Sequence, residues 1–371
     1  MRAGQVLIGP LIPILKVYFD LSNAALSILA GIPIVCFAAT SLIMSQVAKL
    51  GSSNRIIKMA MFALTIALIG RTTTGLIGLY IFAFVMGIAI AIMNYELPAW
   101  VKEHAPTEAG FITGVYATLM GIAAAISIAI SVPLAELNSL SWRMAMVPWI
   151  ALALLTSLYW WRKMDSKEPK TEVRTVAFWK SKAFKNPIAW ALVAFFGLES
   201  MTFYATSTWF PTLLTTKGFT LSSGAIAVSL SGIIGSGVGL VFPYYFEKSR
   251  HQRAMLVWTS LIAGLAFFMI TVQSGLILFI WLSISNIGIS IAFPLALMMA
   301  GMKSDTPEAT RNLSTMMQAF GYSISAFGPI FMATLFDISN SWNFAMHGIV
   351  IVCILQATAG YVVGKPSRID Y

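Results

Sequence analysis

Apolar residues fill most of the chain in long blocks that short polar connections separate. Many blocks approach the ~20 residues that an α-helix needs to cross a ~30 Å hydrocarbon core. We predict twelve membrane helices, over residues 3–17, 24–47, 57–70, 75–97, 110–134, 143–161, 187–213, 224–246, 254–272, 275–299, 312–335 and 343–363. The pattern therefore predicts an all-α integral membrane protein.

The first predicted helix is too short to span. At 1.5 Å per residue, Arg2 would lie ~21 Å inward from Lys16, well within the hydrocarbon. A chain that started there would leave its terminal amine in lipid. We therefore expect a truncated sequence, in which about fifteen to twenty further N-terminal residues complete the first helix. The alternative, a short signal peptide, lacks an Ala-x-Ala cleavage site.

The two halves of the chain resemble each other at an offset near 200 residues. The segment from Ser141 to Met146 aligns with Ser341 to Met346, and Gly121 aligns with Gly321. Together these matches indicate one six-helix unit used twice in parallel. We expect an N-terminal half over 1–161, a linker over 162–186 and a C-terminal half over 187–371.

Composition and charge agree with a membrane location. Of 371 residues, 58% are hydrophobic and 10% are charged, against roughly 25% charged in ordinary soluble domains. A formal charge of +10 would suggest nucleic-acid binding in a soluble protein. Here, however, the basic residues are distributed unequally between the two sides of the membrane. The side that holds the termini, the linker and every second connection has nineteen of them. The opposite side has four, which are Lys16, Arg71, Arg143 and Lys217.

This division predicts that both termini and the linker are cytoplasmic in a bacterial inner membrane, since cytoplasmic loops retain Lys and Arg. We expect no nucleic-acid partner.

Residue types that hold metals or cofactors are scarce. Cys36 and Cys353 lie inside apolar blocks, so we expect no disulfide and no metal site. The three histidines, His104, His251 and His347, lack ligand spacing. There is no phosphate-binding Gly-x4-Gly-Lys-Ser/Thr loop and no catalytic constellation, so we expect neither a cofactor nor an enzyme.

We expect few ionisable residues at membrane depth, where charge is costly and usually functional. Glu199 lies near the middle of the seventh helix, Arg2 on the first and Glu96 toward the cytoplasmic end of the fourth. In one interpretation Glu199 exchanges a proton and Arg2 attracts an anionic or strongly polar solute. In the other, Arg2 and Glu199 pair and neutralise each other. Glu96 fits a snorkelling carboxylate at the interface.

Uncharged polar residues fall on single helix faces. They are Asn94 on the fourth helix, Thr113 and Tyr116 on the fifth, Ser283, Asn286 and Ser290 on the tenth, and Ser314, Gln318, Tyr322 and Ser325 on the eleventh. Small hydroxyls in membrane helices usually bond a backbone carbonyl or a neighbouring helix. The amides and tyrosines are costlier to bury and are candidates for binding solute.

Two connections resemble the gate motif of major facilitator transporters, Gly-x-x-x-Asp-Arg-x-Gly. After the second helix the chain reads Met44-Ser-Gln-Val-Ala48-Lys49-Leu50-Gly51, with Arg55 following, so Lys49 and Gly51 remain and Ala48 replaces the acid. The equivalent segment of the second half, Glu247-Lys248-Ser249-Arg250, keeps an acid and bases.

Nearly the whole chain resembles the cyanate and nitroimidazole transporter branch of that superfamily. The residues that carry the resemblance include Arg2-x6-Gly9-Pro10-Leu11-x-Pro13, Asn94-x-x-Leu97-Pro98, Gly114-x-Tyr116, Asn186-Pro187-x-Ala189-Trp190, Gly197-x-x-Ser200-x-x-x-Tyr204, Trp209-x-Pro211, Gln318-x-x-Gly321-Tyr322 and Gly328-Pro329. The resemblance implies a carrier with both termini inside, a first-helix arginine at Arg2, and Tyr116, Tyr204, Gln318 and Tyr322 lining a central cavity. Glu199 departs from the branch, whose members often carry an amide there.

We therefore expect a monomeric secondary transporter that works by alternating access on a small polar or anionic organic solute or a nitroaromatic compound. Proton coupling through Glu199 remains open. The alternative is a membrane sensor or scaffold that kept the transporter fold without transport, although the chain has no large soluble effector domain.

Overall fold

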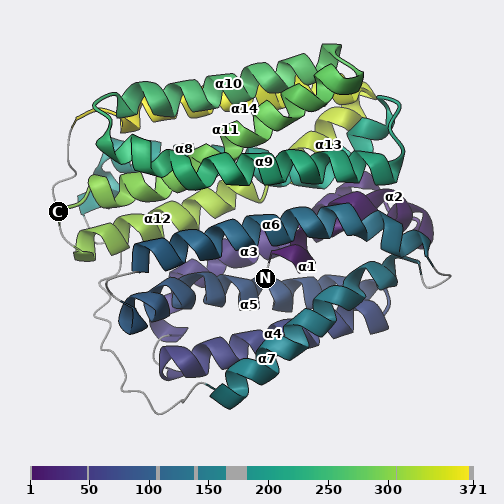
Figure 1. Ribbon diagram of the computed structural model, residues 1–371, viewed down its shortest axis with the longest axis horizontal. Helices are drawn as coiled ribbons and strands as arrows, with labels where there is room; N and C mark the ends of the chain where they lie inside the picture. The colour runs from purple at the N-terminus through teal and green to yellow at the C-terminus, as the bar shows by residue number, and fades with distance from the viewer. Residues whose placement is uncertain are drawn as a thin grey trace. The chain divides into compact units, whose positions relative to one another are not determined.

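The computed structural model describes residues 2–47, 50–105, 109–137, 141–163, 182–305 and 307–366. Within these ranges all regular structure is helical (Figure 1). This is the outcome that lipid imposes, because a backbone inside hydrocarbon must satisfy its own N–H and C=O groups. The predicted all-α membrane fold is confirmed.

The described residues of the first half form eight helical elements. They are α1 (Ala3–Val6), α2 (Ile8–Phe19), α3 (Asn23–Val47), α4 (Ser53–Thr73), α5 (Leu76–His104), α6 (Ala109–Glu136), the 3₁₀ helix η2 (Ser141–Met146) and α7 (Val147–Lys163).

The described residues of the second half also form eight. They are the 3₁₀ helix η4 (Lys182–Lys185), α8 (Pro187–Thr215), α9 (Leu221–Lys248), α10 (Gln252–Val272), α11 (Gly275–Met302), α12 (Pro307–Ser325), α13 (Gly328–Ser339) and α14 (Trp342–Val363).

Eleven helical segments of the described residues are long and apolar enough to cross a membrane, and Ala3–Phe19 is a shorter apolar segment. This agrees with the prediction of eleven full spans and one short one. Several helices exceed their predicted bounds. The third span, expected at 57–70, covers Ser53–Thr73, and the fourth, expected at 75–97, continues to His104. Helices that leave hydrocarbon can continue through polar residues, which a hydropathy boundary misses.

Two spans are broken. The first divides at Leu7 into α1 and α2, where Pro10 has no N–H to offer the Val6 carbonyl. The eleventh, predicted as one helix over 312–335, divides after Ser325, and α13 starts at Gly328. The predicted eleventh span is nevertheless present as one membrane-crossing segment, Asn312–Ser339.

The second break is fixed by a close crossing with α8. A side chain at Gly328 would collide with the Met201 carbonyl oxygen, so the chain needs glycine there to approach α8. The Trp209 indole N–H donates to the Pro329 carbonyl oxygen at 2.9 Å. Pro329 itself offers no N–H to Ser325, so α8 holds both sides of the break.

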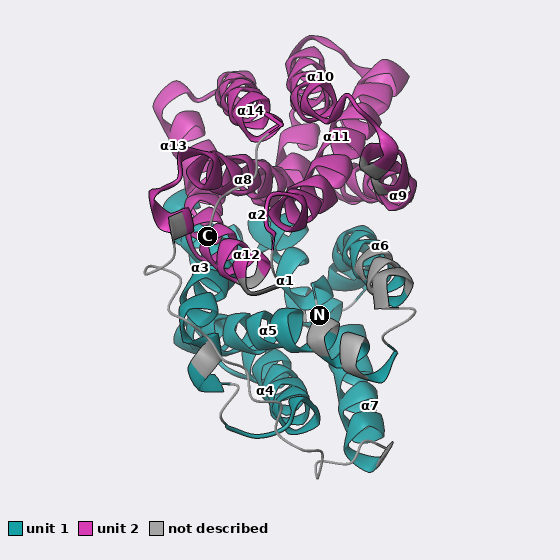
Figure 2. Ribbon diagram, turned by 90° about the vertical axis from the view of Figure 1, so that its left-hand side faces the viewer, with its two compact units in different colours: residues 1–175 teal, residues 176–371 magenta. Residues whose placement is uncertain are grey.

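The chain divides into two compact units, residues 1–175 and 176–371 (Figure 2). Within each unit the same helix pairs pack together. In the first unit α4 packs on α5 and α7, α3 on α5, and α1 on α6. In the second, α10 packs on α11 and α14, α9 on α11, and α8 on α12. Each unit thus repeats one six-span packing plan.

Candidate functional site

In the first unit, three of the predicted site residues lie close together. The Tyr116 hydroxyl on α6 donates to Asn94 Oδ1 on α5 at 3.2 Å. Arg2, directly before α1, lies within electrostatic reach of the Tyr116 hydroxyl. All three side chains are half-buried. A guanidinium, a phenol and an amide therefore share one region among membrane spans, and together they offer several donors to a polar solute.

Helix α1, which follows Arg2 directly, is anchored through its backbone. The Ser127 hydroxyl on α6 donates to the Ala3 carbonyl oxygen at 2.8 Å. The Arg71 Nη1 atom on α4 donates to the Gly4 carbonyl oxygen at 2.9 Å. Both accepting carbonyls belong to residues of α1, within one turn before the break at Leu7. Side chains from two neighbouring helices therefore hold α1, and with it the backbone that carries Arg2.

The position of Arg71 differs from the prediction. The sequence pattern placed it in an outer connection, but it belongs to α4 and is 1% exposed. Its Nη1 atom also lies 3.4 Å from the Met86 sulfur. The sequence gives little sign of this burial, because Arg71 stands at the start of a polar segment, where the hydropathy falls. Its acceptor is 67 residues away along the chain, a contact that no local pattern reveals.

In the second unit, Glu199 is deeply buried. Its side chain is 2% exposed, near the middle of α8. The Ser200 hydroxyl donates to Glu199 Oε2 at 2.9 Å. One turn further along α8, Tyr204 is 4% exposed and lies edge-to-face against Phe203, with ring centroids 5.1 Å apart. An ionisable side chain buried at membrane depth is costly and usually functional, so Glu199 stays a candidate site residue.

Gln318 and Tyr322 lie on α12, one turn apart. Gln318 is half-buried, and Tyr322 packs edge-to-face on Phe196 of α8, with ring centroids 5.1 Å apart. The two helices cross closely, because a Cβ atom at Gly197 would lie 3.1 Å from the Gly321 Cα atom. The motif glycines of the sequence thus set the distance between the α8 and α12 site residues.

Asn286 forms a hydrogen bond between two helices. Its Nδ2 atom on α11 donates to the Ser231 hydroxyl of α9 at 3.0 Å and to the Leu282 carbonyl at 3.1 Å. This bond joins α11 to α9. The structure does not bring Asn286 into hydrogen-bond contact with another predicted site residue, and its role toward solute stays a prediction.

The gate-motif residues have ordinary local contacts. Lys49 and the Glu247 side chain lie outside the described residues. The exposed Arg55 side chain covers Gly51, where a Cβ atom would lie 2.8 Å from Arg55 Cδ. Lys248 donates to the Tyr244 hydroxyl of its own helix at 2.6 Å.

Glu96 departs from the expected snorkelling carboxylate. It is 7% exposed, so its side chain is buried in protein and does not extend to water. No group of three or more His, Cys, Asp or Glu residues that could hold a metal ion occurs in the described part of the chain. Cys36 and Cys353 are free, buried thiols.

Two lysines at the ends of second-unit spans are bound to backbone carbonyls. Lys303, which is buried, donates to the Lys365 carbonyl, and Lys217 donates to the Thr271 carbonyl at 2.6 Å. Burial lowers the pKa of both amines. Cations commonly satisfy carbonyls at such helix ends, so these residues stabilise the unit and are not solute-site candidates.

Two six-span helical units with buried polar side chains define a polytopic membrane transporter. Residues 1–329 match the Major Facilitator Superfamily, and because this match covers most of the chain, the protein belongs to that superfamily. Its relatives and its fold are those of transporters that carry small molecules through the membrane, not of enzymes.

Three relatives align along nearly their full lengths. The protein "Uncharacterized transporter YycB" of Bacillus subtilis (strain 168) is 29% identical, covering 100% of this chain and 92% of its own. The "2-nitroimidazole transporter" of Escherichia coli (strain K12) is 27% identical, covering 97% and 91%. The "Cyanate transport protein CynX" of the same organism is 24% identical, covering 96% and 93%. The predicted branch resemblance is confirmed.

Solved structures show the same fold. A D-xylose-proton symporter aligns with a TM-score of 0.77 at 12% identity, covering 99% of this chain and 94% of its own. A bacterial homologue of the human lysosomal transporter Spinster, in an inward-facing and unoccupied conformation, aligns with a TM-score of 0.79 at 15% identity, covering 98% and 94%. At these identities the likeness concerns the fold alone.

Ser127→Ala should loosen α1, because it removes the donor to the Ala3 carbonyl. A hydrogen bond worth ~1 kcal/mol corresponds to about fivefold faster amide exchange in the segment from Arg2 to Leu15, measurable by hydrogen–deuterium exchange. Ser131→Ala is the matched control, because the Ser131 hydroxyl, buried one turn later, bonds to Ile128 of its own helix. Equal exchange in the two variants would contradict the anchoring role.

Proposed function

We propose that this protein is a secondary transporter for small polar or anionic organic solutes or nitroaromatic compounds. The observation that carries this proposal is the grouping of Arg2, Asn94 and Tyr116 among the spans of the first unit. The alternating-access mechanism follows from the two-unit plan of the superfamily. A non-transporting sensor is disfavoured by relatives named as transporters along their whole lengths.

The donor set suits such solutes. A guanidinium is planar and presents paired N–H groups that match two oxygens of a carboxylate-like or nitro group. The Asn94 amide adds N–H donors beside the Tyr116 hydroxyl. The names of two relatives, for cyanate and for 2-nitroimidazole, describe a small linear anion and a planar nitro compound. Recognition of delocalised charge by Arg2 would accommodate both chemistries.

The second unit carries further candidates for contact with solute. We propose that Tyr204, Gln318 and Tyr322 line the solute path on this side, with Asn286 further along it. Glu199 would be the coupling group, taking up and releasing a proton during the cycle. Its burial and its bond from Ser200 support this role, because a desolvated carboxylate changes protonation state when its surroundings open to water.

The proposed topology places both termini and the linker in the cytoplasm of a bacterial cell, with the protein acting as a monomer in the inner membrane. The burial of Arg71 sharpens the charge asymmetry, because the opposite side then retains Lys16, Arg143 and Lys217. Basic residues strongly favour the cytoplasmic side of membrane proteins.

Arg2→Gln should lower uptake of cyanate or 2-nitroimidazole into proteoliposomes by at least tenfold, because the charged, forked donor is lost. Arg2→Lys should keep charge but lose the paired geometry and retain partial uptake. The matched control, Arg162→Gln, changes an exposed arginine at the end of α7 and should transport normally. Normal uptake by Arg2→Gln would refute the proposed role.

Glu199→Gln should abolish the dependence of uptake on a pH gradient while leaving solute exchange across the membrane intact, because glutamine cannot exchange a proton. Glu136→Gln removes an exposed carboxylate at the end of α6 and serves as the control. Uptake by both variants is compared with and without an imposed gradient. If Glu199→Gln kept the wild-type gradient response, Glu199 would have a structural role only.

A further inference from the structure

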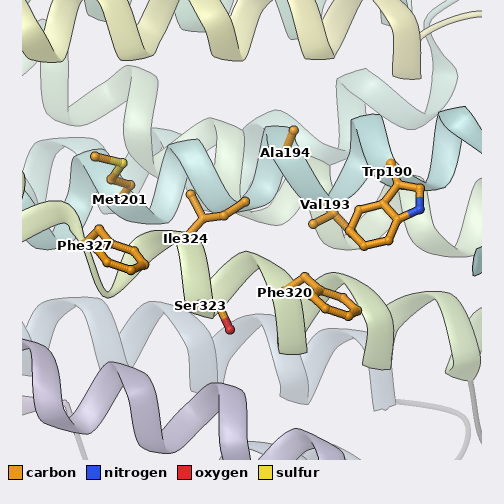
Figure 3. A pocket seen from close by; sticks show the side chains of 8 residues that line it. All are labelled: Trp190, Val193, Ala194, Met201, Phe320, Ser323, Ile324 and Phe327. Atoms are coloured by element: carbon orange, nitrogen blue, oxygen red, sulfur yellow. The ribbon is translucent and has the colours of Figure 1, made fainter. Parts of the chain in front are cut away.

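An apolar groove runs along the second unit between α8 and α12 (Figure 3). It holds about 410 Å³ and is lined by Trp190, Val193, Ala194, Met201, Phe320, Ser323, Ile324 and Phe327. The Phe327 side chain, at the break between α12 and α13, is 64% exposed, and Trp190 is 38% exposed. None of these residues belongs to the proposed solute site. The groove therefore requires a separate explanation.

The lining offers no free side-chain donor to a polar occupant. Its two polar side-chain groups are already engaged. The Ser323 hydroxyl donates to the Ala319 carbonyl at 2.8 Å, and the Trp190 indole N–H donates to the Phe184 carbonyl at 2.8 Å. All other lining side chains are hydrocarbon, aromatic or thioether. A polar solute would lose its hydration here without compensation, so the chemistry selects an alkyl chain.

The length of the groove matches one membrane leaflet. Trp190 and Met201 lie eleven residues apart on α8, which corresponds to ~16 Å along the helix axis. Half of a ~30 Å hydrocarbon core is ~15 Å. Met201 lies near the middle of α8, which covers Pro187–Thr215. The groove thus extends from the N-terminal end of the span to its centre, as one acyl chain of that leaflet would.

The N-terminal end of the groove carries an aromatic cluster beside positive charge. Phe184 of η4 lies 5.4 Å from Trp190 and 6.1 Å from Phe320, between ring centroids. Lys185, the next residue, is exposed. The linker that leads to it, Arg162 to Asn186, contains eight Lys or Arg residues. Tryptophan favours the headgroup level, and basic clusters next to spans attract anionic lipids.

We propose that this groove binds one acyl chain of an anionic phospholipid, whose headgroup lies against Lys185. The occupant belongs to the leaflet at the N-terminal end of α8, which is the cytoplasmic leaflet under the proposed topology. The lipid lies along both α8 and α12, the helices that carry Glu199, Gln318 and Tyr322. Lipid binding and solute transport are separate properties and are measured separately.

Native mass spectrometry of the full chain, extracted with mixed phosphatidylglycerol and phosphatidylethanolamine, tests the proposal. The wild type should retain one phosphatidylglycerol. Ala194→Phe, which fills the groove, should lose it. Lys185→Gln should lower retention of phosphatidylglycerol about fivefold relative to phosphatidylethanolamine, a factor that corresponds to ~1 kcal/mol per basic residue. Lys365→Gln removes an exposed lysine beyond α14 that does not line the groove, and should leave retention unchanged.

Three outcomes would overturn the proposal. The wild type could retain no phospholipid. Ala194→Phe could retain it at the wild-type level while keeping the wild-type melting temperature. Alternatively, 2-nitroimidazole could displace the lipid, which would make the groove a solute site. If Ala194→Phe did not fold, Ile324→Phe, on the α12 wall, would replace it. Transport by the wild type is assayed in parallel, so a failure of the transport proposal is distinguished from a failure of lipid binding.

Discussion

The constraint on which this structure depends is the need to pair every backbone N–H and C=O group within hydrocarbon. Unbroken helices meet it by themselves. The two broken spans receive additional hydrogen bonds from neighbouring helices close to each break. Ser127 and Arg71 bond the Ala3 and Gly4 carbonyls before the first break, and Trp209 bonds the Pro329 carbonyl after the second. Each break is thus stabilised by side chains from other helices of the same unit.

These breaks lie beside the functional side chains. Arg2 directly precedes the anchored segment α1, and Gln318 and Tyr322 stand within two and a half turns before the break in the eleventh span. Irregular backbone is tolerated at membrane depth where protein covers it, and transporters commonly bind solutes near such interruptions. Prolines and glycines interrupt these helices, and the interruptions lie near polar side chains. Glycines also allow helices to cross closely, as Gly197 and Gly321 do between α8 and α12.

Hydropathy predicted most of the fold, because the thickness of the bilayer sets the length of each span. Each span is therefore visible as a continuous apolar segment of the sequence. The repeat of residues near Trp142 and Trp342 predicted two six-helix halves. The burial of Arg71 and of Glu96 could not be predicted, since each depends on which neighbouring helix covers it. Gly328-Pro329 signalled a breaker, but the position of the break depends on Met201 and Trp209 of another helix. The Tyr116–Asn94 bond likewise joins two helices whose rotations the sequence does not determine.

The proposed transport function depends on alternating access by the two units, which distances between spin labels would reveal. Exposed positions Leu137 and Thr215 report on the side where α6 and α8 end, and His104 and Arg250 on the side where α5 and α9 end. Cys36 and Cys353 are buried and free, so Ser replaces both. Adding cyanate or 2-nitroimidazole should shift the two distance distributions in opposite directions. Distributions that stay unchanged, or that shift in the same direction, would contradict alternating access.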